Sequence, residues 1–260
     1  MAPANRPPSL FSTSPAVVIL LIANIAVFLM GYLVRDGSGL FATTGALWFP
    51  LNEHFGAWQL VSYMFLHGSV THIFFNMFAL VSFGRVIEWE WGTSRFLVFY
   101  FICGVGAGLT QLAVDWREFN SLHNQLVGAG LTPSAIDSIL ATGGGDVPQD
   151  ASVKAMLFQL YRIYATPMVG ASGAIYGLLV AFGFLHPNAR LALMFVPVPI
   201  AAKYFIPGII LLDLFSGVTG FSLFGAGIAH YAHVGGAAIG FLLMLLWRKR
   251  SRRVIRLGPA

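Results

Sequence analysis

Long apolar runs dominate this 260-residue chain and restrict the folds that it can adopt. Only 10% of its residues are charged and its mean hydropathy is +0.76, which is more apolar surface than one soluble core can bury. About 20 helical residues cross the roughly 30 Å of hydrocarbon in a bilayer. Five runs approach or reach that length: residues 16–34, 60–84, 96–114, 168–185 and 228–247. A sixth, 204–216, is shorter and follows Pro197, Pro199 and Lys203, so we expect an irregular entry.

These runs predict an all-α, polytopic membrane protein built as a six-transmembrane-helix bundle. Residues 1–14 are expected to form a short cytoplasmic segment, 15–248 the six-helix domain, and 249–260 a basic cytoplasmic tail. A long external insertion, 115–166, separates the third and fourth helices. Within it we predict short helices at 133–140 and 153–164, joined through three consecutive glycines.

The distribution of Lys and Arg sets the expected orientation. They are concentrated after residue 247, so the positive-inside rule places both termini in the cytoplasm. The pI near 9.6 then reflects topology and contact with anionic lipid, since no nucleic-acid-binding motif is present. The N-terminus lacks an Arg- and Ser-rich transit pattern, which favours a bacterial plasma membrane. The single cysteine, Cys103, excludes an intramolecular disulfide.

Polar residues cluster where the second, fourth and sixth runs begin. With the N-terminus inside, all three beginnings lie at the outer face, at one depth in the membrane. Polar groups at membrane depth are a functional hypothesis by default. The residues concerned are His67, His72, Asn76, Ser172, Tyr176, His230 and His233.

Helical spacing predicts which of these side chains can meet. At about 100° per residue, His72 and Asn76 share a helix face, whereas His67 and His72 do not. A zinc-binding helix places two histidines four residues apart with a glutamate between them, and no acid lies between His67 and Asn76. We therefore expect no metal site and no cofactor.

Small residues predict contact between the fourth and sixth helices. Gly173 and Gly177 form one GxxxG motif and Gly236 and Gly240 another, a spacing that lets helix backbones approach closely in lipid. That contact would bring Ser172 within reach of a histidine, and a serine beside a general-base imidazole is an activated nucleophile. The alternative is that the glycines only pack and Ser172 bonds to its own helix.

Gly170 precedes the fourth helix, where free N–H groups and the positive end of the helix dipole converge. These groups would stabilise an oxyanion, and His72 and Asn76 could add side-chain donors. Tyr176 lies one turn below Ser172 and could stack on the imidazole or be an ordinary buried aromatic residue.

Asp213 raises the possibility of a Ser-His-Asp triad. It lies on a different run among leucines, where a neutral structural carboxyl costs less than an ion. We therefore predict a serine–histidine pair without it. His186 and Asn188 are placed on the cytoplasmic side, too far away to join Ser172.

Taken together, these motifs resemble the rhomboid intramembrane serine proteases over residues 16–247. The resemblance is carried by Trp58, by His67-x4-His72-x3-Asn76, by Gly-Ala-Ser-Gly at 170–173 with Tyr176, and by Ala-His-Val-Gly-Gly at 232–236. It implies a six-helix fold with a water-filled cavity open to the outer side. Gln59 is a departure, because the residue after Trp58 is often Arg in that family.

The resemblance also implies roles for the site residues. Ser172 would be the nucleophile and His233 its base, with His72, Asn76 and the Ser172 backbone forming the oxyanion site. Tyr176 would pack under His233, and His67 would be a structural hydrogen-bonding residue.

The predicted function is cleavage of transmembrane segments of single-span or polytopic proteins near the outer face of the bilayer. A substrate helix would unwind before attack, since helical carbonyls are already hydrogen-bonded, and the loop 218–227 is a candidate lid. The alternative is a non-catalytic binding or quality-control protein of the same fold. A transporter fits less well, because the inner halves of the spans are nearly all apolar. The substrate and the oligomeric state stay open.

Overall fold

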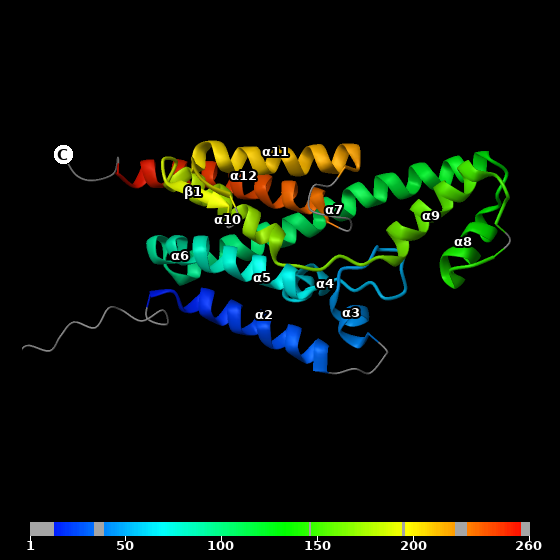
Figure 1. Cartoon of the computed structure of the whole chain (residues 1–260), viewed down its shortest axis with the longest axis horizontal. Coiled ribbons are helices and arrows are strands. Elements are labelled where there is room, and N and C mark those ends of the chain that lie inside the picture. The colour runs from blue at the N-terminus through cyan, green and yellow to red at the C-terminus, as the bar shows by residue number, and fades with distance from the viewer. Residues whose placement is uncertain (1–12, 34–38, 146, 194–195, 222–227, 256–260) are drawn as a thin grey trace, which may run out of the picture.

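The computed structural model describes residues 13–33, 39–145, 147–193, 196–221 and 228–255. Most of these residues are helical (Figure 1), as predicted. The helices are α2 (Pro15–Leu33), α3 (Leu40–Gly45), α4 (Gln59–Ser62), α5 (Val70–Ala79), α6 (Arg85–Trp91), α7 (Thr93–Gly128), α8 (Pro133–Thr142), α9 (Ala151–Ala165), α10 (Ser172–Leu185), α11 (Ala202–Thr219) and α12 (His230–Ile255). A 3-10 turn, Tyr63–Phe65, follows α4, and a π-helical turn, Leu80–Gly84, joins α5 to α6.

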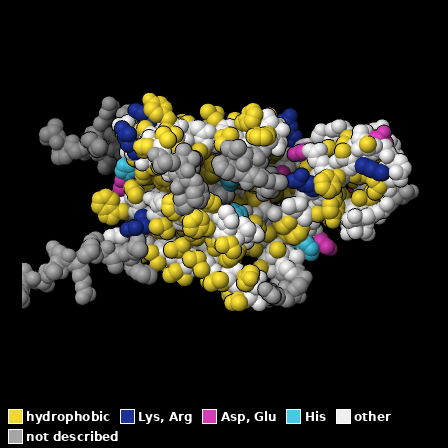
Figure 2. All heavy atoms as spheres, viewed as in Figure 1, with side chains coloured by type: hydrophobic (Ala, Val, Ile, Leu, Met, Phe, Trp, Pro, Cys, Tyr) yellow, Lys and Arg dark blue, Asp and Glu magenta, His cyan; other side chains and the backbone are white. Residues whose placement is uncertain are grey.

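Five helices of the described chain are long and apolar enough to cross a membrane. They are Pro15–Leu33, Val70–Trp91, Thr93–Gly128, Ala202–Thr219 and His230–Trp247. Hydrophobic side chains cover much of the visible face of the bundle, while Lys and Arg gather toward its ends and on the arm beyond it (Figure 2). The chain is therefore an integral, multi-pass membrane protein, as predicted.

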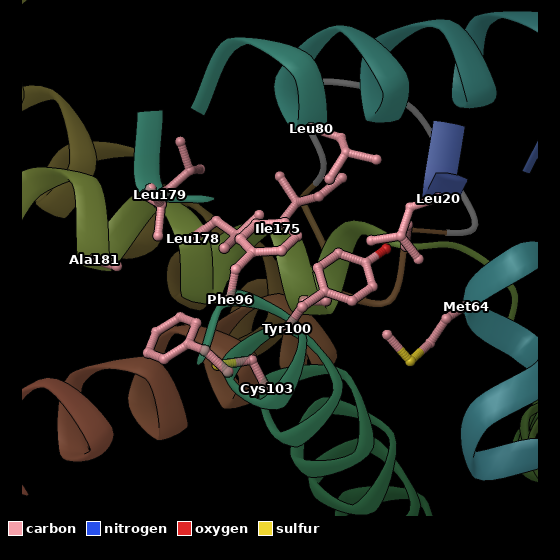
Figure 3. Close-up of a cluster of buried hydrophobic side chains, with 14 of the residues drawn as sticks. Leu20, Met64, Leu80, Phe96, Tyr100, Cys103, Ile175, Leu178, Leu179 and Ala181 are labelled. Carbon is pink, nitrogen blue, oxygen red and sulfur yellow. The ribbon is translucent and has the colours of Figure 1, made fainter. Parts of the chain in front are cut away.

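The remaining apolar helix, α10, lies at the centre of the bundle. Its 14 residues reach only about 21 Å, and it packs against α7, α11 and α12. Ile175 and Leu178 from α10 meet Phe96 and Tyr100 from α7 in the main core (Figure 3). Cys103 is fully buried there with a free thiol.

Glycines let α10 and α12 touch through their backbones. A Cβ atom added to Gly236 would lie 1.9 Å from the carbonyl oxygen of Gly173, and one added to Gly240 would lie 2.8 Å from the Cα of Gly177. No side chain fits into such gaps. The predicted contact between the two GxxxG motifs is therefore confirmed.

Buried Glu88 of α6 ties the start of α2 to the bundle. Its two carboxylate oxygens each accept a hydrogen bond of 2.9 Å, one from the backbone N–H of Ala16 and one from that of Val17. A carboxylate at a helix N-terminus satisfies free N–H groups and opposes the helix dipole. Three residues further on, Trp91 stacks edge-on against Trp247 of α12. The beginning of α2 and this part of α12 therefore lie at the same end of the bundle.

The insertion at residues 115–166 is more ordered than predicted. The third span does not end near residue 114, because α7 continues as one helix to Gly128 over about 54 Å. The expected short helices are present as α8 and α9, and Gly143 ends α8 with a positive φ of 69°. These two helices and the far half of α7 share a second apolar core and project beyond the other helices as an arm (Figure 1).

The entries to two of the predicted spans are also defined, and only the first of them differs from the prediction. The second span does not begin at residue 60: the chain from 59 to 69 forms α4, the 3-10 turn and a loop, and α5 begins after Ser69, whose Oγ caps the N–H of His72 at 3.1 Å. The irregular entry to α11 is an antiparallel hairpin of β1 (Arg190–Leu193) and β2 (Val196–Ala201). Pro197 and Pro199 disfavour a helix interior and leave β2 extended.

We predict that Glu88→Ala lowers the free energy of unfolding by about 1–3 kcal/mol, because it leaves the N–H groups of Ala16 and Val17 unpaired in a buried site. Denaturant titration of the purified protein in mixed micelles measures the change. Glu53→Ala is the matched control, since that side chain is 84% exposed. Equal stability of the two variants would contradict the capping role.

We also predict that Gly236→Ala forces α10 and α12 apart, because the added methyl group meets the backbone of Gly173. The expected result is a lower midpoint of thermal unfolding. Gly208→Ala on α11 is the control, since nothing lies within 4 Å of its Cβ position and alanine favours a helix. An unchanged midpoint for Gly236→Ala would refute the close approach.

Candidate active site

Ser172 is the first residue of α10 and is held by the extended segment that precedes it. Met168 and Leu47 exchange backbone hydrogen bonds of 2.8 and 2.9 Å, and the N–H of Gly170 donates to the carbonyl of Tyr63 at 2.9 Å. Gly170 has a φ of 127°, a conformation that residues with a side chain rarely adopt. The turn into α10 therefore depends on glycine and fixes the position of the serine.

His233 lies in the first turn of α12, directly opposite this serine. Its Nε2 is 2.7 Å from Ser172 Oγ, a full hydrogen-bond contact between residues 61 positions apart. Tyr176 stacks on the imidazole with ring centroids 4.3 Å apart and planes 12° from parallel. The predicted meeting of serine and histidine and the predicted aromatic stacking are both confirmed. All three side chains are only partly buried, so the site is accessible.

His72 and Asn76 of α5 converge on Gly170, two residues before the serine. A Cβ atom at Gly170 would lie 2.8 Å from His72 Nε2 and 3.7 Å from Asn76 Nδ2. The Asn76 amide nitrogen is buried and has no hydrogen-bond partner among the described residues, although buried donors are normally paired. No side chain caps the N-terminus of α10, so its first N–H groups are unpaired within the helix. His72 and the unpaired amide of Asn76 therefore lie beside the turn that leads into α10.

His67 does not occupy the predicted position. It lies in the loop before α5 instead of on the helix, so the inference that it faces away from His72 is wrong, and the two rings meet edge to face at 5.0 Å. Both ring nitrogens are buried, and neither makes a hydrogen bond of standard geometry with a described residue. The structural role that the resemblance implies for His67 therefore stays a prediction.

Asp213 is part of the site, contrary to the prediction that set it apart. Its Oδ1 lies 3.3 Å from His233 Nδ1 and 2.5 Å from His230 Nδ1, while the hydroxyl of Tyr176 donates to Oδ2. The contact arises because α11 packs against both α10 and α12. His230 and His233 are three residues apart and share a helix face, which was the sequence signal for a common partner. His186, by contrast, pairs with Glu90 at the far end of α10, as expected.

The carboxylate and the two imidazoles also form a group of potential metal ligands. One atom from each of Asp213, His230 and His233 lies within 4.8 Å of the others, and zinc sites use such donors. The sequence pattern did not predict this group. In the structure Asp213 Oδ1 lies within hydrogen-bond distance of the Nδ1 atoms of both imidazoles.

Gln59, which stands where the resemblance leads us to expect an arginine, anchors the loop between α3 and α4. Its buried amide nitrogen donates to the His54 carbonyl at 2.7 Å, and its oxygen accepts from the Trp48 N–H at 3.2 Å. Trp48 follows Leu47, whose backbone pairs with the segment leading to Ser172. The loop is therefore anchored despite the departure. In the candidate lid, residues 222–227, including Phe224, lie outside the described residues.

Comparison with known proteins agrees with this architecture. The Rhomboid domain family model matches residues 54–141 and 150–250. An uncharacterized mitochondrial rhomboid protein of Schizosaccharomyces pombe, P4H10.10, is 26% identical over an alignment of 278 residues. The alignment covers 95% of this chain and 69% of that protein. The Rhomboid protease GlpG of Yersinia pestis and that of Yersinia pseudotuberculosis are 25% identical over 190 residues. That match covers 68% of this chain and 65% of each relative, just under two thirds. Because the family model spans most of the sequence, the chain belongs to the Rhomboid family.

Proposed function

We propose that this protein is an intramembrane serine endopeptidase that cleaves transmembrane segments of other membrane proteins. The observation that carries the proposal is the 2.7 Å contact between Ser172 Oγ and His233 Nε2. It joins a nucleophile and a base on two helices of an apolar bundle. Membership of a family that includes the Yersinia rhomboid proteases supports the same reaction class.

In the proposed reaction His233 acts first as a base and then as an acid. Nε2 accepts the hydroxyl proton of Ser172 while Oγ attacks the carbonyl carbon of the scissile peptide bond. Nε2 then donates this proton to the leaving amine, which leaves an acyl group on Ser172. A water molecule, deprotonated by the same nitrogen, hydrolyses the ester and restores the serine.

The free donors near Gly170 are suited to the oxyanion that forms during attack. We assign His72 Nε2, Asn76 Nδ2 and the first N–H groups of α10 to this role, because the two side chains lie beside Gly170, two residues before the nucleophile, and no side chain caps α10. Such donors act most strongly on charge that develops only in the transition state. The unpaired amide of Asn76 gains its partner when the substrate carbonyl becomes negatively charged.

The position of the site limits the substrates and their orientation. Ser172 and His233 begin α10 and α12, whereas the start of α2 and Trp247 lie at the opposite end of the bundle. With both termini in the cytoplasm, cleavage occurs toward the outer face, in substrate segments that unwind readily at Gly, Pro or small residues. The named relatives come from a mitochondrion and from bacteria, so the bacterial plasma membrane stays a prediction.

We predict that a fluorophosphonate probe labels the wild-type protein at Ser172. Ser172→Ala should abolish labelling, and His233→Ala should reduce the rate of labelling by at least about 100-fold, a typical loss for a general base. Ser138→Ala, an exposed serine on α8, is the control and should label normally. Gel fluorescence and peptide mass spectrometry measure the extent and the site.

Labelling that persists in Ser172→Ala would refute the assignment of the nucleophile. Cleavage of single-span test proteins in liposomes is the second readout. If Ser172→Ala leaves the cellular function intact, the protein is a non-catalytic binding or quality-control factor instead.

We further predict that Asn76→Ala lowers kcat by about 100- to 1,000-fold, as does loss of one oxyanion donor in other serine proteases. KM should change little, because the ground-state carbonyl gains less from this amide than the transition state does. Asn120→Ala on the arm is the control for loss of an exposed amide. A raised KM with unchanged kcat would contradict the oxyanion role.

A further inference from the structure

The carboxylate of Asp213 collects hydrogen bonds from three side chains on two neighbouring helices. The Nδ1 atoms of His230 and His233 lie 2.5 and 3.3 Å from the same oxygen, Oδ1. The hydroxyl group of Tyr176 donates a hydrogen bond to the other oxygen, Oδ2. Asp213 itself is only 8% exposed. In the described part of the chain, this is the acid that contacts the proposed active site.

This set of contacts favours an ionised Asp213 with both imidazoles protonated at Nδ1. A carboxylate ion is purely an acceptor and can accept from all three groups at once. A neutral carboxyl group would have to direct its own proton at one of them and reverse that contact. Burying the negative charge is unfavourable unless it is hydrogen-bonded, and the three donors provide those bonds.

The Nδ1–H tautomer has a direct consequence for His233. With its proton on Nδ1, the imidazole has its lone pair on Nε2, the atom that lies 2.7 Å from Ser172 Oγ. Only this tautomer can accept the serine proton. The ring is held on its face by Tyr176 and at its Nδ1 edge by Asp213.

We propose that Asp213 is a positioning residue of this site, which rests on the proposed protease function. It fixes the Nδ1–H tautomer of His233 and stabilises the imidazolium that forms when the Oγ–H bond of Ser172 breaks and an Nε2–H bond forms. The proton on Nδ1 stays on the ring, so the carboxylate is never protonated. The reacting unit is therefore a serine, a histidine and an aspartate, with His230 and Tyr176 holding the carboxylate in place.

The test is Asp213→Asn, which keeps the size of the side chain but removes its charge. On a single-span test protein in liposomes, kcat should fall by about 100- to 10,000-fold, the range expected when the histidine loses its orienting carboxylate. KM should stay close to that of the wild type. Asp137→Asn, the same change on the exposed surface of α8, is the matched control and should leave both constants unchanged.

His230→Gln tests whether Asp213 positions His233 or only anchors His230. If the carboxylate serves His233, His230→Gln should retain at least about ten times the kcat of Asp213→Asn, since a loss of about 1.4 kcal/mol corresponds to a factor of ten. Equal losses in the two variants, or a wild-type kcat in Asp213→Asn, would overturn the proposal.

A spectroscopic readout does not depend on whether Asp213→Asn folds. In Ser172→Ala protein with ¹⁵N-labelled histidine, the His233 ring should show a protonated Nδ1 and an unprotonated Nε2. The opposite tautomer would overturn the proposal. Activity that Ser172→Ala does not abolish would instead refute the protease function, so the two failures can be told apart.

Discussion

The contact between the backbones of α10 and α12 is the constraint on which the rest of this structure depends. Gly173 and Gly236 approach so closely that not even a methyl group fits between them, and lipid gives helices no hydrophobic reason to associate. The approach therefore depends on close packing and on hydrogen bonds between the helices. Because Ser172 and His233 lie at the adjacent ends of these two helices, the same contact sets the distance between hydroxyl and imidazole.

Polar groups inside such a bundle are unfavourable unless they are paired, and this chain pairs most of them. Asp213 has three donors, Glu88 caps the start of α2, and Gln59 bonds the loop between α3 and α4. Asn76 is different, since its buried amide nitrogen has no partner in the described part of the chain. An unpaired donor beside a nucleophile is stabilised when negative charge appears there, which connects the packing of the fold with the proposed chemistry.

Local sequence patterns predicted the helices and the main pair of site residues well. The lengths of the apolar runs predicted the membrane spans, and the GxxxG motifs predicted the helix contact that brings Ser172 to His233. These local patterns did not predict the positions of residues that depend on tertiary contacts. Nothing local shows that Asp213, among leucines, faces two histidines of the next helix, because that depends on how α11 packs. Likewise, an apolar run does not show that the chain before Ser69 leaves the helix and brings His67 against His72.

In the proposed enzyme a serine and a histidine from distant parts of the chain act as one catalytic unit. Comparing kcat for Ser172→Ala, His233→Ala and the double variant tests it most directly, since residues that act together show strongly non-additive losses. The account predicts that the double variant loses no more activity than Ser172→Ala alone. If the two losses multiply, the residues act independently and the claim is wrong.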